Sequence, residues 1–371
     1  MSTFLELGVD KKYMEALKEL NIKSPTEIQE LTIPILLKKP TDFIGLAQTG
    51  TGKTAAFGLP ILHHINPELG AIQTLVLSPT RELVQQIKKQ LFRYTKYTED
   101  KIFIEAVYGG EKIDKQMSNL SRTTHVVVAT PGRLIDLIER GSINLKQVNT
   151  VVLDEADEML SMGFKQDINT VLRYCAKTSK TWLFSATMPE EIRGIIKKYM
   201  TSDAERVEIT KNRAVNENIT HRYIKTTIKE KYNDIVGFLE GADDARGIIF
   251  CRTKAGTRNL CEQLLEDGFS VGALEGDMQQ KERDKVMRAF KNQTIQVMIS
   301  TDVSARGIDV QNLGFVLHHQ LPEKMEYYTH RSGRTARAGK TGVSIAFIIP
   351  NEVEKIKEIQ EALGIQFKEI K

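Results

Sequence analysis

The sequence predicts an α/β fold of two domains, each with a mainly parallel sheet flanked by helices. Short apolar runs rich in β-branched residues alternate with amphipathic helical patterns along the 371 residues, which is typical of a parallel sheet covered on both faces. A polar segment at 206–217 lacks both periods and interrupts this alternation once. We therefore predict a first domain at 1–205, a linker at 206–217 and a second domain at 218–371.

Each domain has its own series of candidate elements. In the first half the candidate strands lie at 42–46, 74–78, 102–107, 125–129, 150–153 and 181–184. Leu83, Ile87 and Leu91 repeat every four residues, which predicts a helix over 81–94 with one apolar face. In the second half the candidate strands lie at 247–250, 269–273, 295–299, 315–318 and 343–349, followed by an amphipathic helix at 352–363.

Composition indicates a globular protein of ordinary type. The hydrophobic share is 41% and the charged share 27%, which excludes disordered and fibrous classes. Neither an apolar run of membrane-spanning length nor a secretory signal is evident, and Cys175, Cys251 and Cys261 form no Cys-x-x-Cys pair. We expect a cytoplasmic protein with reduced thiols, monomeric by default, whose net charge of +4 permits a polyanionic partner without requiring one.

A phosphate-binding loop follows the first candidate strand and precedes a helical pattern. Its residues are Gln48, Thr49, Gly50, Thr51, Gly52, Lys53 and Thr54, after Ala47. The glycines allow backbone N–H groups to face phosphates, while the lysine reaches the β- and γ-phosphates and the threonine hydroxyl ligates Mg²⁺. Farther on, the strand at 150–153 ends in Asp154 and Glu155, which suits a Mg²⁺ partner beside a group that polarises the attacking water.

These two motifs together resemble the DEAD-box RNA helicases. The sequence Asp-Glu-Ala-Asp stands at 154–157, and the family's version of the phosphate loop also begins with alanine. The resemblance covers essentially the whole chain. It implies two tandem RecA-like domains, ATP with Mg²⁺ as cofactors, and single-stranded and short duplex RNA as partners.

Further segments match the family's nucleotide-binding elements. The N-terminal segment 2–30 resembles the adenine-reading element, in which Gln29 would bond the adenine edge, with Phe4 as the preceding aromatic. Ile22 stands where family members often stack an aromatic ring. In the second domain, Gly307 and Asp309 would contact the nucleotide.

Segments at strand ends match the family's RNA-binding elements. They offer backbone N–H groups, hydroxyls and guanidinium groups, which suit sugar-phosphate oxygens and carry no sequence information. The first domain contributes Pro79, Thr80, Arg81, Gly109, Gly110, Thr130, Pro131, Gly132 and Arg133. The second contributes Arg252, Thr253, Gln280, Arg283, Thr301 and Asp302, and Glu275 stands where the family usually has histidine.

Two motifs would couple the ATP and RNA sites. Ser185 and Thr187 resemble the element whose hydroxyls bond Asp157 and the neighbouring domain. Arg334 and Arg337 resemble arginine fingers and, three residues apart, would face one way on a helical turn. Such fingers stabilise charge that develops during phosphoryl transfer. His330 would couple the acidic loop to the closure of the second domain over the first.

The predicted function is ATP-dependent RNA remodelling with sequence-independent RNA binding. Two alternatives stay open from the residues: an ATPase of the same superfamily that acts on DNA, and an ATP-locked RNA clamp with low turnover. The complete set of Lys53, Glu155, Arg334 and Arg337 favours turnover.

Overall fold

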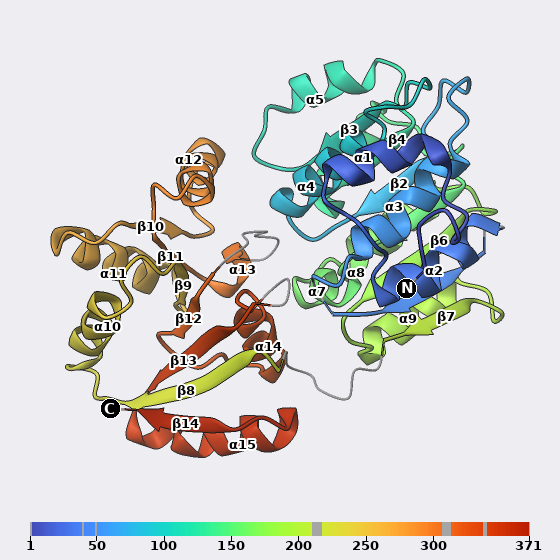
Figure 1. Cartoon of the computed structure of the whole chain (residues 1–371). Helices are drawn as coiled ribbons and strands as arrows, with labels where there is room; N and C mark the ends of the chain where they lie inside the picture. Colours follow the sequence, from blue (N-terminus) through green and yellow to red (C-terminus); the bar gives the residue numbers. More distant parts are fainter. Residues whose placement is uncertain are drawn as a thin grey trace. The chain divides into compact units, whose positions relative to one another are not determined.

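The computed structural model of the chain describes residues 2–38, 41–48, 50–209, 217–305, 313–336 and 340–370. The chain divides into two compact units, Met1–Thr210 and Lys211–Lys371, called here the first and second unit (Figure 1). In the described residues no helix combines the length and the apolarity that a membrane crossing requires.

Each unit is built on a seven-stranded parallel sheet, so the predicted fold class is confirmed. The strands of the first unit are β1 (Phe43–Leu46), β2 (Thr74–Leu77), β3 (Ile104–Val107), β4 (Val126–Ala129), β5 (Thr150–Leu153), β6 (Lys180–Ser185) and β7 (Glu205–Glu208). Those of the second unit are β8 (Ile219–Lys225), β9 (Gly247–Phe250), β10 (Val271–Leu274), β11 (Val297–Ser300), β12 (Phe315–His318), β13 (Gly342–Ile348) and β14 (Phe367–Ile370).

Helices cover both faces of each sheet (Figure 1). The helices of the first unit are α1 (Met14–Glu19), α2 (Glu27–Lys38), α3 (Lys53–His64), α4 (Arg81–Tyr94), α5 (Ile113–Leu120), α6 (Pro131–Glu139), α7 (Ala156–Ser161), α8 (Lys165–Tyr174) and α9 (Glu190–Tyr199), with a 3₁₀ turn at Lys11–Tyr13. Those of the second unit are α10 (Lys231–Glu240), α11 (Lys254–Glu266), α12 (Gln280–Lys291), α13 (Asp302–Ala305), α14 (Met325–Ser332) and α15 (Val353–Leu363), with a 3₁₀ turn at Pro350–Glu352.

Strand β4 shows why these sequences form double-faced sheets. Val126 and Val128 point into the apolar core that also contains Phe57 of α3. Val127 points into the other core, with Leu134 of α6. Both faces are therefore buried, which explains the continuous apolar run.

The strand order is the same in both units. It is β3-β4-β2-β5-β6-β1-β7 in the first and β10-β11-β9-β12-β13-β8-β14 in the second. Adding seven to each number of the first order gives the second, so each strand and the helix after it have a counterpart in the other unit. In parallel sheets of this kind ligands bind beyond the carboxyl ends of the strands.

One expectation for the linker is wrong. Residues 206–208, which we expected to lie in the linker, belong to β7, whose residues pair in parallel with β1. Only Val207 of this strand is buried, so its sequence lacks the apolar run that predicted the inner strands. Its pairing with β1 makes it a strand.

Candidate functional site

The predicted site segments of the first unit lie together at one edge of its sheet, where the strands end. Four backbone hydrogen bonds continue the ladder past the strand ends and join neighbouring segments: Thr130 N–H to Val107 O at 2.9 Å, Ser78 N–H to Ala129 O at 3.0 Å, Asp154 N–H to Leu77 O at 2.9 Å and Ala47 N–H to Ser185 O at 3.0 Å. The phosphate loop and the acidic segment therefore face the same edge as the predicted RNA segments, although they are far apart in sequence.

The phosphate loop turns sharply into α3. Gly52 caps this helix with φ of +95° and Gly50 has φ of +82°, a region that favours glycine. Lys53 is buried, and its ammonium donates to Ala47 O at 3.0 Å, across the loop. The cation is thus held inside the loop that the helix N-terminus opens, an arrangement that suits phosphate. Thr54 is on the first turn of α3, whereas Thr49 lies outside the described residues.

Gln29 connects the N-terminal segment to the phosphate loop. Its carboxamide accepts from Thr26 N–H at 3.0 Å and donates to Gly52 O at 2.9 Å. A Cβ on Gly52 would clash with this carboxamide, so the close approach requires glycine. Because an amide oxygen has a second lone pair and an amide nitrogen a second hydrogen, Gln29 keeps the capacity to bond a base edge. Phe4 is buried in the apolar core, and Ile22 packs partly buried against it.

Asp154 and Glu155 are buried carboxylates at the end of β5, with exposed fractions of 4% and 8%. Burial raises the pKa of Asp154 to about 7, with Glu155 and Asp157 adding to the shift and Lys53 opposing it. Oδ1 of Asp154 is buried and has no hydrogen-bond partner among the described residues. Glu155 takes a left-handed backbone conformation with φ of 50°, which is unusual for a residue with a side chain.

Asp157 ties the acidic segment to the end of β6. Its Oδ2 accepts from the backbone N–H of Thr187 at 2.9 Å and from the Thr187 hydroxyl at 2.8 Å. The hydroxyl bond to Asp157 that we expected from this element thus comes from Thr187, and the Ser185 hydroxyl donates to Thr187 O at 2.7 Å. Ser185 therefore shapes the turn in which Thr187 meets Asp157.

On the RNA half of the edge, Arg81 lies across the glycine turn that follows β3. A Cβ on Gly110, which has φ of +87°, would clash with the Arg81 guanidinium. Thr80 caps α4 by accepting from Leu83 N–H at 3.3 Å. The remaining predicted residues of this half are Pro79 before the cap, Gly109 beside Arg81, Thr130 and Pro131 at the start of α6, Gly132 with open space around it, and Arg133, which donates to Glu111 O at 3.0 Å.

The second unit repeats this arrangement after β9, β10 and β11. Thr253 caps α11 by accepting from Gly256 N–H at 3.0 Å. Arg252 donates to Leu321 O at 3.0 Å, and Gln280 donates to Asp284 at 2.8 Å. Arg283 is buried and donates to Glu275 O at 3.0 Å. Thr301 and Asp302 follow β11.

A small pocket in the second unit brings together Asp302, His330 and Arg334. Arg334 does not lie on a helix as expected, because α14 ends at Ser332. It lies in the following turn, where its Nε donates to His330 O at 3.2 Å. Arg337, Gly307 and Asp309, which we also predicted in this region, lie outside the described residues.

Comparison with known proteins identifies the family. A family model described as DEAD/DEAH box helicase matches residues 26–195, and one described as helicase conserved C-terminal domain matches residues 230–339. The chain is 40% identical over all its residues to DEAD-box ATP-dependent RNA helicase CshA of Geobacillus kaustophilus, covering 79% of that protein. It is 39% identical to CshA of Bacillus subtilis, with 97% of this chain and 72% of the relative covered. The chain belongs to the DEAD-box ATP-dependent RNA helicases.

Solved structures of DEAD-box proteins agree with this family. S. cerevisiae Dbp5 bound to RNA and ADP BeF3 matches with a TM-score of 0.91 and 32% identity, over all of this chain and 96% of that one. A DEAD box protein from the hyperthermophile Methanococcus jannaschii matches with a TM-score of 0.56 and 38% identity, over 100% and 99% of the two chains. This DEAD-box chain is therefore an enzyme that uses ATP and unwinds RNA. This conclusion favours the RNA helicase over the DNA-acting ATPase that the sequence motifs left open.

Sequence reasoning assigned no role to Arg331, which is 1% exposed. Its guanidinium pairs with Asp302 at 2.6 Å, donates to Gln320 O at 2.8 Å and lies over the Phe250 ring at 5.2 Å. It joins the start of α13 to α14 and thereby shapes the pocket containing His330. Its position between the predicted His330 and Arg334 indicated that it belongs to this motif. Nothing in the sequence indicated that its side chain is buried.

Proposed function

We propose that ATP binds at the β1, β5 and β6 end of the first-unit edge and RNA at the β2, β3 and β4 end. The supporting observation is the hydrogen bond from Asp154 N–H to Leu77 O, which joins the two halves of this edge. In this proposal Lys53 and the loop from Gln48 to Thr54 bind the phosphates. Gln29 reads the adenine edge, with Phe4 and Ile22 providing apolar support.

Glu155 is the group proposed to activate the attacking water. Its carboxylate is largely buried at the strand end beside Asp154, and a fixed carboxylate within reach of water is suited to general base chemistry. The left-handed backbone at this residue supports the proposal, because strained conformations concentrate at functional sites.

The residues of the first unit fit a bound Mg²⁺. In the described part of the chain no three His, Cys, Asp or Glu side chains are grouped as metal ligands. Mg²⁺ in phosphoryl-transfer sites commonly uses one or two protein oxygens together with substrate phosphates. Asp154, with its buried Oδ1 lacking a partner among the described residues, and the Thr54 hydroxyl would hold it. When bound, the ion would neutralise charge on the β- and γ-phosphates.

The second unit would complete both sites. Arg334 and Arg337 are the proposed arginine fingers, Gly307 and Asp309 the additional nucleotide contacts, and His330 the residue that senses the acidic segment. The pocket that holds His330 and Arg334 also contains Asp302, a predicted RNA residue, so one structural feature connects the two proposed functions. Closure of the units around both ligands would favour a bent single strand and separate a short duplex locally, and hydrolysis would release the RNA.

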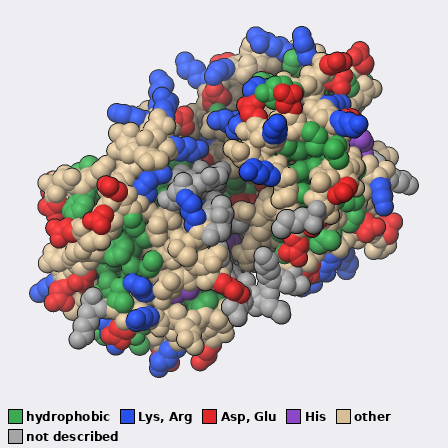
Figure 2. Space-filling view, viewed as in Figure 1, with side chains coloured by type: hydrophobic (Ala, Val, Ile, Leu, Met, Phe, Trp, Pro, Cys, Tyr) green, Lys and Arg blue, Asp and Glu red, His purple; other side chains and the backbone are tan. Residues whose placement is uncertain are grey.

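The proposed RNA contacts are to the backbone and therefore independent of sequence. They comprise Pro79 to Arg81, Gly109, Gly110, Thr130 to Arg133, Arg252, Thr253, Gln280, Arg283, Thr301 and Asp302. Figure 2 shows Lys and Arg interspersed with Asp and Glu on the visible face of each unit. This distribution suits RNA binding by individual side chains and backbone groups more than by a broad positive surface.

Steady-state ATP hydrolysis tests the proposal directly. The intact chain should hydrolyse ATP faster with a short single-stranded RNA than without it, and less fast with matched DNA, because 2′-hydroxyl contacts distinguish the two. Equal rates with and without RNA would contradict the coupling. Tight RNA binding in ATP with negligible turnover would instead favour the ATP-locked clamp.

A further inference from the structure

The two units contain the same set of contacts around the turn after β3 and after β10. These strands are counterparts in the repeated strand order, as are the helices α4 and α11, and α5 and α12. In both units glycine is the second residue after the strand. The two pairs are Tyr108-Gly109 after β3 and Glu275-Gly276 after β10.

In the first unit, two side chains hold Tyr108. Gln85 of α4 donates to the Tyr108 hydroxyl at 2.7 Å. Gln116 of α5 donates to the Tyr108 carbonyl at 2.9 Å. Arg81, at the start of α4, lies across the glycines that follow. The side chain and the backbone of the residue before glycine are thus both fixed.

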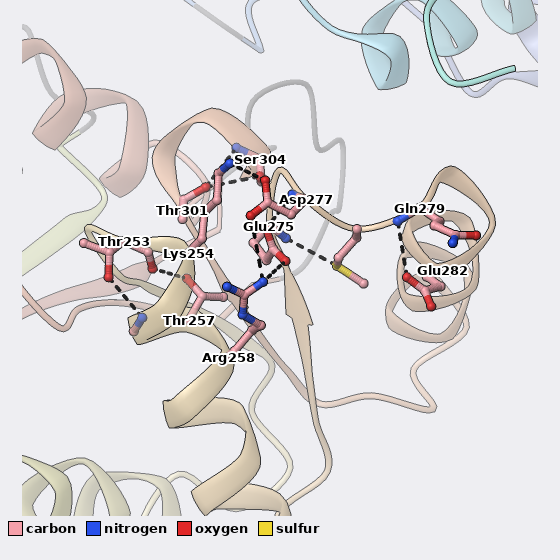
Figure 3. A network of polar contacts seen from close by, with 12 residues as sticks. Thr253, Lys254, Thr257, Arg258, Glu275, Asp277, Gln279, Glu282, Thr301 and Ser304 are labelled. Carbon is pink, nitrogen blue, oxygen red and sulfur yellow. Dashed lines mark hydrogen bonds and ion pairs between the residues drawn. The ribbon is translucent and has the colours of Figure 1, made fainter.

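In the second unit, two arginines hold Glu275 in the same way. Arg258 of α11 pairs with the Glu275 carboxylate at 3.0 Å. Arg283 of α12 donates to the Glu275 carbonyl at 3.0 Å. Lys254, at the start of α11, lies across Gly276, and a Cβ there would be 3.2 Å from its Cε. Figure 3 shows Arg258 directed from α11 toward Glu275, with Lys254 and Asp277 close by.

The helix positions of these partners also correspond. Gln85 and Arg258 each lie four residues after the first residue of their helix, Arg81 and Lys254. Gln116 and Arg283 each lie three residues after the first residue of α5 and α12. The same two positions therefore hold the same turn in both units, with neutral groups in one and charged groups in the other.

The charged contacts of the second unit hold the turn strongly because Glu275 is only 2% exposed. A buried carboxylate is costly unless its oxygens are bonded. Besides Arg258, it accepts from the backbone N–H of Asp277 at 2.6 Å, across Gly276. Asp277 in turn pairs with Lys254. A different backbone conformation of 275–277 would move the Asp277 N–H away from this buried carboxylate.

We propose that Glu275, Arg258 and Arg283 are positioning residues that hold the 275–277 backbone ready to receive an RNA phosphate, and that Tyr108, Gln85 and Gln116 do the same for 108–110. This inference rests on the proposed RNA-binding role of these edges. It gives Arg283, which is also a proposed RNA contact, a bond to the protein backbone. We call the contacts of Glu275 with Arg258 and Arg283 the clamp. Its central residue, Glu275, stands where the family usually has histidine.

Two single variants test the clamp in the intact chain. Glu275→Gln keeps the size of the side chain and removes its charge, and the half-exposed Arg258 can then be hydrated. Arg258→Gln removes the other partner. Each should raise the concentration of a single-stranded uridine oligonucleotide that half-saturates ATPase stimulation, by about fivefold, the factor expected for one lost hydrogen bond. The rate at saturating RNA should stay within about twofold, because positioning affects binding of RNA.

The direction of the Glu275→Gln effect distinguishes positioning from direct contact. If Arg258 bound phosphate itself, releasing it from Glu275 would tighten RNA binding. Loss of a direct phosphate contact would also lower the slope of log affinity against log salt by about one. A positioning defect should weaken binding and leave that slope unchanged.

A double variant keeps the test decisive if a single variant is unstable. Arg258→Gln with Glu275→Tyr installs the neutral pair that Gln85 and Tyr108 form in the first unit. Because the hydrogen bond is remade, this double variant should restore the half-saturating RNA concentration to within about twofold of wild type. Glu369→Gln, which breaks an exposed ion pair with Lys225 in the same unit, is the matched control and should have no effect.

The outcomes separate this inference from the proposed function. Unchanged half-saturation in both single variants, or tighter binding by Glu275→Gln, would overturn the clamp while RNA stimulation of the wild type remained. A double variant that folds, as judged by its thermal transition, but binds RNA no better than the single variants would also overturn it. Absence of RNA stimulation in the wild type would instead contradict the proposed function.

Discussion

At residue 155 the backbone conformation helps to aim a carboxylate. The left-handed φ of 50° directs Glu155 at the end of β5, and such conformations cost about 1–3 kcal/mol for residues other than glycine. A cost of this kind persists where the surrounding structure fixes the residue, as the neighbouring Asp157 does through Thr187. We interpret residue 155 as a functional position whose conformation is held by the acidic segment.

Glu155→Gln should leave ATP binding within about twofold and lower hydrolysis by about a hundredfold or more, because the amide cannot accept a proton from water. A fluorescent ATP analogue measures binding, and phosphate release measures turnover. Glu190→Gln is the control, since Glu190 is exposed on α9 of the same unit. Hydrolysis by Glu155→Gln close to the wild-type rate would remove Glu155 from the reaction.

At the scale of secondary structure, Asp42 fastens three segments of the first unit. It is buried, and it accepts from Thr181 N–H at 2.7 Å, from Thr201 N–H at 2.8 Å and from the Thr201 hydroxyl at 2.9 Å. These bonds hold the start of β1 against β6 and the segment that leads into β7. The edge strand that the sequence did not predict therefore depends on a polar residue at the start of the sheet.

Asp42→Ala should destabilise the first unit by about 3 kcal/mol, because the buried Thr181 N–H and the part-buried Thr201 N–H lose a charged acceptor. Urea unfolding followed through Trp182, the sole tryptophan, reports this unit, and the indole donates to Thr41 O at 3.0 Å next to the mutated site. Asp100→Ala, which removes an exposed ion pair with Lys12, should change stability by less than about 0.5 kcal/mol. Equal effects of the two variants would contradict this account.

The second unit has a buried polar layer between β8, β12 and α14. His221 accepts or donates a bond with the Tyr328 hydroxyl at 2.6 Å, and His318 stacks on the Tyr328 ring with centroids 4.8 Å apart. Burial lowers the pKa of His221 from 6.5 to about 4, and burial together with Arg331 lowers that of His318 well below 6.5. Both imidazoles are therefore neutral in the folded unit at neutral pH.

This layer predicts acid lability of the second unit. Because the pKa of His221 is lower in the folded state, the unfolded state binds more protons as the pH falls from 6.5 toward about 4, and stability is lost in that window. In calorimetry, His221→Gln should lose less stability than wild type between about pH 7 and about pH 5, by on the order of 1–2 kcal/mol. An identical pH dependence in the two proteins would contradict the prediction.

At the scale of the whole molecule, the proposal requires that ATP and RNA stabilise one closed state. Linkage then demands that RNA tighten binding of a non-hydrolysable ATP analogue by the same factor by which the analogue tightens RNA, typically about 5–150-fold. Titrations of each ligand with and without the other measure both factors. Unequal factors would show an error in the titrations, and factors of one would show that the two ligands do not share a closed state.

Local sequence patterns predicted most of the inner structure. Helix α4 runs from Arg81 to Tyr94 as predicted, because Thr80 caps it and its apolar repeat is complete. The edge strands β7 and β14 were missed, as was β8, which lies between β13 and β14. In β7 only Val207 is buried, so no apolar run marks it. A strand such as β4, buried on both faces, reveals itself by composition, whereas β7 depends on its pairing with β1.

By itself the sequence determined the fold class, the family and the order of the motifs, because these depend on short-range periodicity and contiguous residues. The tertiary structure decided which distant side chains meet. The bonds from Gln85 and Gln116 to Tyr108, and from Arg258 and Arg283 to Glu275, join a strand end to two separate helices. Such contacts follow from strand order and helix packing, which no local pattern encodes.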